Sequence, residues 1–254
     1  MKKVKRRRLK KWVKNLIKVV LLLFIILLMS KCFFNHKDTK NNSINKTKKI
    51  IEKINDSKKT DILKNIKKLY KINNDLVGYL VIPDTKINYP VMYTKGKDYY
   101  LRRDFNKNKN TAGTLYIDKY NMIEPRDTNL IIYGHNMNND GTMFHDLELF
   151  REEDFYKKHK NFFYYTLKEK EEYEIVSVFI SEVYRVIDDE FKYYQFYNAD
   201  DKEDMDEYLK NIKKLSLYDT GVDIEYGDEL LTLSTCEYSK ENSRFVVVAK
   251  KVKW

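Results

Sequence analysis

From about residue 77 onward, hydrophobic residues occur in short runs rich in β-branched and aromatic side chains, separated by polar turns. Runs of this kind are typical of β-strands. Pro83 and Pro90 interrupt the first run, and a turn near 168–171 divides the longest into a hairpin. About eight strands are predicted in this way, within residues 78–94, 111–118, 129–136, 161–184, 229–236 and 244–254.

Helical spacing dominates elsewhere. Apolar residues recur at intervals of three and four within 49–73, with a break near 55–59, which predicts two helices or one kinked helix. Residues 143–159 and 199–217 also have helical spacing; the second segment has Asp200 and Asp201 near its start and lysines near its end. Because strands outnumber helices and connections are short, we expect a mainly β fold, an antiparallel sheet curled into a barrel at about 77–254.

The N-terminal segment is different in kind. Residues 1–34 combine a strongly basic stretch with an apolar run from 16 to 34, interrupted only by Lys18 and Lys31. This length matches a single bilayer crossing, and the preceding positive charge keeps that side cytoplasmic. We therefore expect a cell-membrane protein with one N-terminal anchor, a polar linker at 35–48 and an extracytoplasmic folded domain at 49–254. A cleaved signal peptide and a lipoprotein modified at Cys32 are alternatives, although no small-residue cleavage site follows the run.

The formal net charge of +11 does not indicate a nucleic-acid-binding domain. Eleven of the 49 Lys and Arg residues lie within residues 1–31, which contain no acid, and this leaves 38 basic against 38 acidic residues. A nucleic-acid partner requires a basic face on the folded part. The sequence therefore predicts no nucleic-acid partner.

Cys236 is the first candidate for chemistry. It ends the strand pattern TLSTC and enters a polar loop, and Arg244 opens the next strand pattern after seven intervening residues. If those strands pair, the two side chains meet above one sheet face. A free cysteine is often a buried bystander, and a nucleophilic one needs a nearby base or positive charge, because an ordinary thiol has a pKa of about 8.5. Both interpretations of Cys236 stay open on the residues alone.

His135 is the candidate acid or base, because it follows Gly134 at the exit of the pattern NLIIY. His145 is its rival but sits within helical spacing, as a surface or packing residue would. A phosphatase loop would have five residues between cysteine and arginine and would lack the acids found here. No set of ligands for a metal is apparent. The sequence thus predicts neither a metal nor another cofactor.

Together, TLSTC, the arginine at 244 and the upstream YGHN resemble the sortases, membrane-anchored cysteine transpeptidases of Gram-positive bacteria. The segments TAGTLYID, NLIIYGHNM and TMFHDL, with the helix before TLSTC, resemble class B in particular. The similarity covers about 50–254. It implies a closed sortase-like β-barrel of about eight strands, with helices before it and one helix before the catalytic strand.

The resemblance implies roles as well. Cys236 would be the nucleophile, His135 the general acid and base, and Arg244 the clamp on the substrate carbonyl. Ser234 and Glu237 would contact substrate. The enzyme would cleave the C-terminal sorting signal of surface proteins after a threonine, of an NPQTN-like or xPxTG-like motif. It would pass the acyl group through a thioester to a peptidoglycan amine, with a bell-shaped pH profile.

Two alternatives remain, a membrane-anchored peptide-binding domain without catalysis and a cysteine protease that releases the same acyl-enzyme to water. The sequence does not distinguish hydrolysis from transfer, nor does it identify the motif, the amine or the client proteins.

Overall fold

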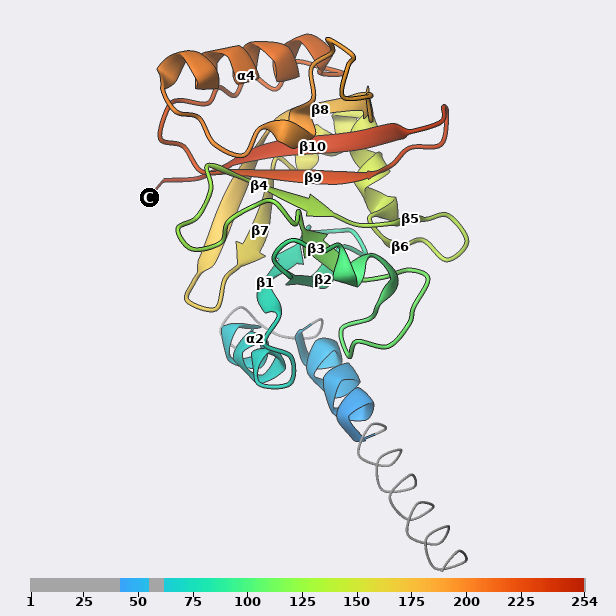
Figure 1. The fold of residues 1–254 in the computed structure, drawn as a ribbon. Helices are drawn as coiled ribbons and strands as arrows, with labels where there is room; N and C mark the ends of the chain where they lie inside the picture. Colours follow the sequence, from blue (N-terminus) through green and yellow to red (C-terminus); the bar gives the residue numbers. More distant parts are fainter. Residues whose placement is uncertain (1–41, 55–61, 254) are drawn as a thin grey trace, which may run out of the picture. The chain divides into compact units, whose positions relative to one another are not determined.

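A computed structural model describes residues 42–54 and 62–253 of the chain. Contact clustering divides the chain into two compact units, Met1–Lys49 and Ile50–Trp254, and the second carries the candidate site. Its strands form a closed barrel in the order β1-β2-β3-β4-β9-β10-β8-β7, beside a small two-stranded sheet of β5 and β6 (Figure 1). The predicted fold class, a mainly β barrel of eight strands with a few helices, is confirmed.

The strand bounds agree with the hydrophobic runs. The barrel strands are β1 Leu76–Val81, β2 Asn88–Met92, β3 Leu115–Ile117, β4 Asn129–Tyr133, β7 Asn161–Tyr165, β8 Lys170–Glu182, β9 Leu230–Cys236 and β10 Ser243–Lys251. Most neighbours pair antiparallel, but β2 with β3 and β4 with β9 pair parallel. The parallel β4–β9 pair brings two segments a hundred residues apart in sequence together with their carboxyl ends at the same end of the barrel.

The helical elements of the described residues are short. They comprise a helix over 42–54, α2 Ile62–Tyr70, η1 Tyr99–Arg102, η2 His145–Arg151, α3 Glu153–Lys158, η3 Tyr193–Gln195 and α4 Lys202–Leu215. The small sheet consists of β5 Asn136–Met137 and β6 Thr142–Met143.

Both faces of β9 and β10 are buried, which explains why their sequences are apolar almost throughout. Leu231, Leu233 and Val247 point into the barrel core. The alternate residues Val246 and Val248 pack in a second cluster with Met205, Tyr208 and Ile212 of α4. Figure 1 shows α4 lying across this side of the sheet. A strand covered on both sides gains hydrophobic stabilisation from both sets of side chains.

The helix predicted within 199–217 is α4. The Asp201 side chain caps it by accepting a hydrogen bond of 3.0 Å from the Asp204 amide. Glu203 and Asp204 lie in the first turn and Lys213 and Lys214 in the last, so the charges oppose the helix dipole at both ends.

Two predicted boundaries differ from the structure. Residues 143–159 do not form one helix: they begin in β6 and continue as η2 and α3, because Glu152 has extended backbone angles and separates the two helices. The predicted linker at 35–48 overlaps the helix at 42–54. Ile50 and Ile54, spaced one helical turn apart, are buried in that helix with Leu69 of α2.

The predicted membrane location requires a correction. Among residues 42–54 and 62–253, no helix is long and apolar enough to cross a bilayer. The helix α4 has 14 residues and a charged outer face, whereas a span needs about 20 predominantly apolar residues. The predicted anchor and basic tail at 1–34 lie outside the described residues. Because no described helix could cross a bilayer, the structure does not support the predicted assignment to the membrane.

Candidate active site

Cys236 and Arg244 are direct cross-strand partners. In the antiparallel β9–β10 ladder, Arg244 pairs with Cys236 and Val246 pairs with Ser234. Directly opposite residues of such a ladder place their side chains on the same face, with Cβ atoms about 5 Å apart. The face is the one that carries Val246, which lies on the α4 side of the sheet. The register therefore places the Cys236 thiol and the Arg244 guanidinium on the same face of the sheet.

His135 comes to the same end of the barrel through β4. Tyr133 pairs with Ser234 in the parallel β4–β9 ladder, and the Gly134 amide extends it by donating to the Ser234 carbonyl at 3.2 Å. Two residues beyond this pair, His135 lies just past the end of β4 and Cys236 ends β9. The three residues therefore lie at the same end of the barrel, on the segment that follows β4 and on the neighbouring strands β9 and β10. Each is half-buried, so each is accessible to a substrate.

Contacts on both sides hold His135 in place. Its Nε2 lies 2.9 Å from the Leu101 carbonyl oxygen of η1, and its own carbonyl accepts the Phe144 amide at 2.8 Å. Because a carbonyl oxygen only accepts, Nε2 carries a proton. No described residue bonds to Nδ1, which leaves that ring atom available for proton exchange.

The glycine before His135 has a packing role. A Cβ on Gly134 would come within 2.4 Å of Leu115 Cδ2 and 2.7 Å of Phe144 Cδ2. Its φ is not in the left-handed region. Glycine is needed here because two core side chains leave no room for a larger residue.

Arg244 keeps most of its hydrogen-bonding capacity. Its Nη1 donates to the Ser243 carbonyl at 2.9 Å, and no carboxylate within residues 62–253 forms an ion pair with it. Tyr193 and Tyr116 flank the pair. Burial raises the pKa of the Tyr193 hydroxyl, opposed by its hydrogen bond with Ser234 and by the charge of Arg244. A guanidinium with unused donors at a half-buried site can bind an oxygen on which negative charge develops.

Ser234 and Glu237 are placed less favourably for the predicted substrate contacts. Ser234 is fully buried, and its hydroxyl lies 2.7 Å from that of Tyr193. Glu237 is only 7% exposed; it accepts hydrogen bonds from the Ser239 hydroxyl at 2.5 Å and from Arg151 at 3.3 Å. Burial would raise the pKa of Glu237, but these bonds and the charge of Arg151 hold it below its ordinary value. Either side chain would give up existing bonds to reach a substrate.

No sequence pattern singles out Asn136, which the structure places beside the site. Its side chain donates to the Cys236 carbonyl at 3.1 Å. The one available signal was its position directly after His135, and no local pattern distinguishes a buried asparagine from a loop residue. His145 lies 2.8 Å from the Asn136 Oδ1, beside the candidate pair and not in place of His135.

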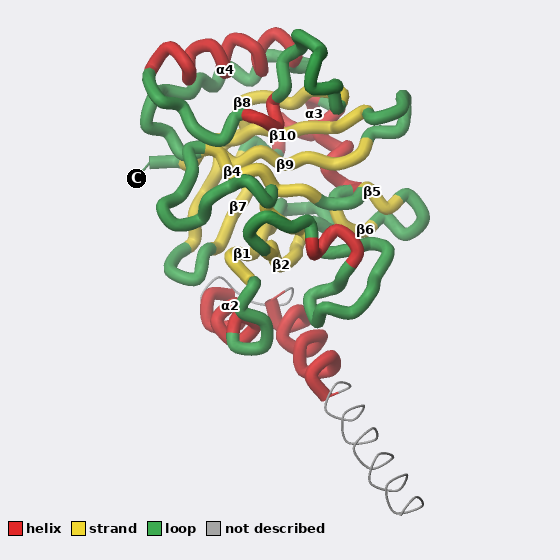
Figure 2. Tube along the Cα trace, in the orientation of Figure 1, coloured by secondary structure: helices red, strands yellow, loops and turns green. Residues whose placement is uncertain are grey.

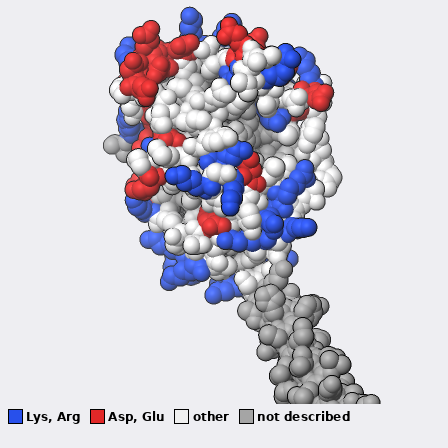
Figure 3. All heavy atoms as spheres, viewed as in Figure 1, with Lys and Arg blue, Asp and Glu red and all other residues white. Residues whose placement is uncertain are grey.

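Charge and metal-ligand placement set further bounds. Within the described part of the chain, no group of three or more His, Cys, Asp or Glu side chains is arranged to hold a metal ion. Figure 3 shows acidic side chains gathered where α4 lies and basic side chains more numerous over the lower half of the face in view, with a few acids among them.

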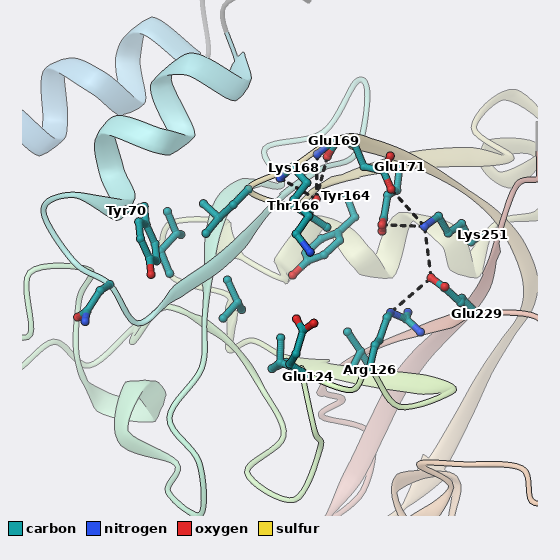
Figure 4. A pocket seen from close by; sticks show the side chains of 16 residues that line it. Tyr70, Glu124, Arg126, Tyr164, Thr166, Lys168, Glu169, Glu171, Glu229 and Lys251 are labelled. Atoms are coloured by element: carbon teal, nitrogen blue, oxygen red, sulfur yellow. Dashed lines mark hydrogen bonds and ion pairs between the residues drawn. The ribbon is translucent and has the colours of Figure 1, made fainter.

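A pocket of about 450 Å³ lies at the opposite end of the barrel from Cys236. It is lined by Leu76 at the start of β1, Glu229 just before β9 and Lys251 at the end of β10. Figure 4 shows that several of its charged side chains pair with one another: Lys251 contacts Glu171 and Glu229, and Arg126 contacts Glu229. This pocket contains none of the residues that the sequence predicts to be catalytic.

Comparison with known proteins agrees with this geometry. The family profile described as "Sortase domain" matches residues 80–252. The chain is 37% identical over 190 residues to sortase B of Listeria monocytogenes, which covers 74% of both chains. It is 33% identical over 187 residues to sortase B of Staphylococcus aureus, which covers 73% of both.

Solved structures show the same relationship. The crystal structure of Clostridium perfringens sortase B is 36% identical, with a TM-score of 0.65 over 74% of this chain and 99% of that one. The Staphylococcus aureus sortase B–substrate complex is 29% identical, with a TM-score of 0.69 over 85% and 97% of the two chains.

A closed eight-stranded barrel with a cysteine and an arginine side by side at one end defines a sortase, and the chain belongs to that family. Within it, the chain is a class B sortase, a cysteine transpeptidase.

Proposed function

We propose that the protein cleaves the C-terminal sorting signal of surface proteins after a threonine and transfers the new carboxyl end to a peptidoglycan amine. One observation supports this proposal: His135, just past the end of β4, lies at the same end of the barrel as Cys236 and Arg244, which pair across the neighbouring strands β9 and β10. A thiol, an imidazole and a guanidinium so arranged supply a nucleophile, a proton carrier and an oxyanion clamp.

In the first half-reaction, the Cys236 thiolate attacks the threonine carbonyl carbon. Arg244 donates to the carbonyl oxygen as it becomes negative. The carbon–nitrogen bond then breaks, and His135 gives a proton to the departing amine nitrogen. The product is a thioester between the substrate and Cys236.

In the second half-reaction, an amine attacks the thioester carbon. His135 takes the proton that the amine loses, and the carbon–sulfur bond breaks to regenerate the thiolate. Water in place of the amine would give hydrolysis through the same intermediate. The balance between the two products therefore depends on which nucleophile reaches the thioester first.

Exposed apolar side chains near Cys236 support a peptide as substrate. Val186 is 91% exposed and Ile187 81%, in the loop that follows β8, and Tyr238 is 60% exposed just after Cys236. The β8 end lies beside the start of β10, because Glu182 pairs with Ser243. Large apolar side chains clustered at a site favour contact with a partner's apolar groups.

The test is intact-mass spectrometry of the purified protein with peptides of the NPQTN and xPxTG kinds, with and without a glycine-based or diaminopimelate-type amine. We expect a thioester adduct on the wild type that the amine releases as a conjugate, and none on Cys236→Ala. An adduct that only water releases would support a protease. A folded protein with a free thiol that forms no adduct with any peptide would argue for a binding domain without catalysis.

A further inference from the structure

A buried hydrogen-bond network joins the segment that carries His135 to the strand that carries Cys236. At its centre is Asn136, which is 4% exposed and pairs with Met143 in the β5–β6 sheet. In Figure 2 the β5–β6 hairpin and the β9–β10 loop lie at the same end of the barrel. This network lies within the site, but nothing in the cysteine chemistry described above makes use of it.

The Asn136 amide group has three partners. Its Nδ2 donates to the Cys236 carbonyl and to Glu148 Oε1, both at 3.1 Å, and its Oδ1 lies 2.8 Å from His145 Nδ1. The carbonyl and the carboxylate only accept, so the amide cannot be flipped without placing its oxygen against both of them. Oδ1 therefore faces His145, and the His145 Nδ1 donates to it.

The network continues on both sides of Asn136. Its backbone carbonyl accepts a hydrogen bond of 2.6 Å from the Tyr238 hydroxyl, two residues after Cys236. Glu148 accepts from Arg151 at 2.8 Å, and Arg151 also donates to Glu237 at 3.3 Å. The residue after His135 is thus linked to the residue before the β9–β10 loop and to the loop itself.

We propose that Asn136 is a positioning residue that fixes the separation of His135 and Cys236. It does not touch the reacting atoms. It joins the two backbones directly, since its own residue follows His135 and its side chain bonds to the carbonyl of Cys236. A displacement of about 1 Å between catalytic groups costs on the order of 10²-fold in rate.

Two other features of the molecule give weaker grounds for a proposal. In the pocket of Figure 4, Lys251 and Arg126 already pair with carboxylates of the lining. His159 bridges Asp84 at 3.0 Å and the Phe155 carbonyl at 2.9 Å, a contact on loops that do not carry His135 or Cys236. The Asn136 network has more bonds, deeper burial and a direct link to the nucleophile.

The matched control is Asn129, at the start of β4, the strand that leads to His135. It is fully buried, its Nδ2 donates to the Phe196 carbonyl at 2.9 Å, and its Oδ1 accepts from Thr232 at 2.9 Å. Asn129→Ala therefore removes a comparable network from β4 without touching His135 or Cys236. The two alanine variants should lose similar stability, and only one should lose catalysis.

The proposal rests on the proposed function, so two measurements are made on wild type, Asn136→Ala, Asn129→Ala, His135→Ala and the double variant Asn136→Ala with His135→Ala. The first is the steady-state rate with the sorting peptide and amine. We expect kcat of Asn136→Ala to fall by about 10²-fold with KM changed by less than about threefold. Asn129→Ala should keep kcat close to wild type at a temperature where both variants are folded.

The second measurement needs no substrate. It is the pH dependence of Cys236 alkylation by iodoacetamide, followed by intact mass. We expect Asn136→Ala to shift toward the profile of His135→Ala, and the double variant to match His135→Ala alone, because Asn136 acts through His135. Asn129→Ala should keep the wild-type profile.

Equal losses of kcat in both asparagine variants, or a wild-type alkylation profile in Asn136→Ala, would overturn the proposal and leave a structural role. If Asn136→Ala does not fold, Asn136→Ser makes the same test with a smaller polar change. A wild type that is inactive with every peptide would sink the proposed function alone, because the alkylation profiles would still decide the role of Asn136.

Discussion

Arginines at the two ends of the barrel have contrasting surroundings. Near the start of β9, Arg126 donates to the carbonyls of Asp127, Thr128 and Leu230 and contacts Glu229 at 3.5 Å. At the far end of β9, Arg244 bonds to one carbonyl and pairs with no carboxylate of the described residues. A fully paired guanidinium stabilises the fold, whereas one with spare donors is available to a ligand.

The same contrast applies to the neighbouring acids. Glu229 and Glu171 neutralise Lys251 in the pocket at the first end. At the second end Glu237 is turned away from Arg244 and bonds to Arg151 and Ser239. The polar groups beside Cys236 thus pair with partners that leave the Arg244 cation unneutralised. Removing a charge should affect stability at one end and catalysis at the other.

The sharpest test replaces each arginine by alanine. For Arg244→Ala we expect kcat/KM to fall by about 10²- to 10³-fold, the cost of one lost oxyanion donor, with the melting temperature nearly unchanged. For Arg126→Ala we expect a loss of roughly 2 kcal/mol in unfolding free energy, because several buried acceptors lose a charged donor, with kcat/KM retained. Peptide turnover and urea unfolding of both variants decide this. Similar losses of activity in both would erase the contrast.

The next largest effect concerns pH. Catalysis that uses a thiolate together with a protonated imidazole should give a bell-shaped dependence of kcat/KM on pH, falling at both extremes. Arg126→Ala should keep the shape of that curve, because its end of the barrel takes no part in proton transfer. The measurement is kcat/KM between pH 5 and 10. A flat curve would contradict the roles of Cys236 and His135.

A smaller effect is expected at Glu237, whose pKa is held below the ordinary value of 4.5. A carboxyl with a lowered folded-state pKa contributes stability above the unfolded value, and loses it as pH falls through the folded one. Glu237→Gln should therefore lower the free energy of unfolding at pH 7 by about 1 to 2 kcal/mol. The difference should shrink below about pH 4.5. Denaturant unfolding of both proteins across pH 3–7 measures it, and a gap that stays constant with pH would exclude the ionised form as its source.

The smallest expected effect is that of a chelator. Both half-reactions use only thiol, imidazole and guanidinium groups, so EDTA should leave peptide turnover unchanged. Turnover is measured before and after dialysis against EDTA, with added Ca²⁺ as a control. Abolition by EDTA and recovery with Ca²⁺ would show that a metal supports the site.

The strands and the candidate chemistry could be predicted from the sequence. Runs of β-branched and aromatic residues predicted the barrel strands, since their side chains favour a pleated surface buried on one or both faces. The pairing of the strands that carry Cys236 and Arg244 was only a condition at the level of sequence, and the β9–β10 register meets it. The motif resemblance then predicted the family that the comparisons establish.

Three features of the protein depend on its tertiary structure. It divided the expected helix at 143–159 at Glu152, where the backbone is extended, and Phe144, Leu147 and Phe150 pack into the barrel core at intervals of three residues. It buried Ser234 and Glu237 among partners distant in sequence. It also brought Asn136 to the carbonyl of Cys236, a hundred residues away. Such contacts depend on the parallel register of β4 and β9, and local sequence patterns carry no information about which distant strands become neighbours.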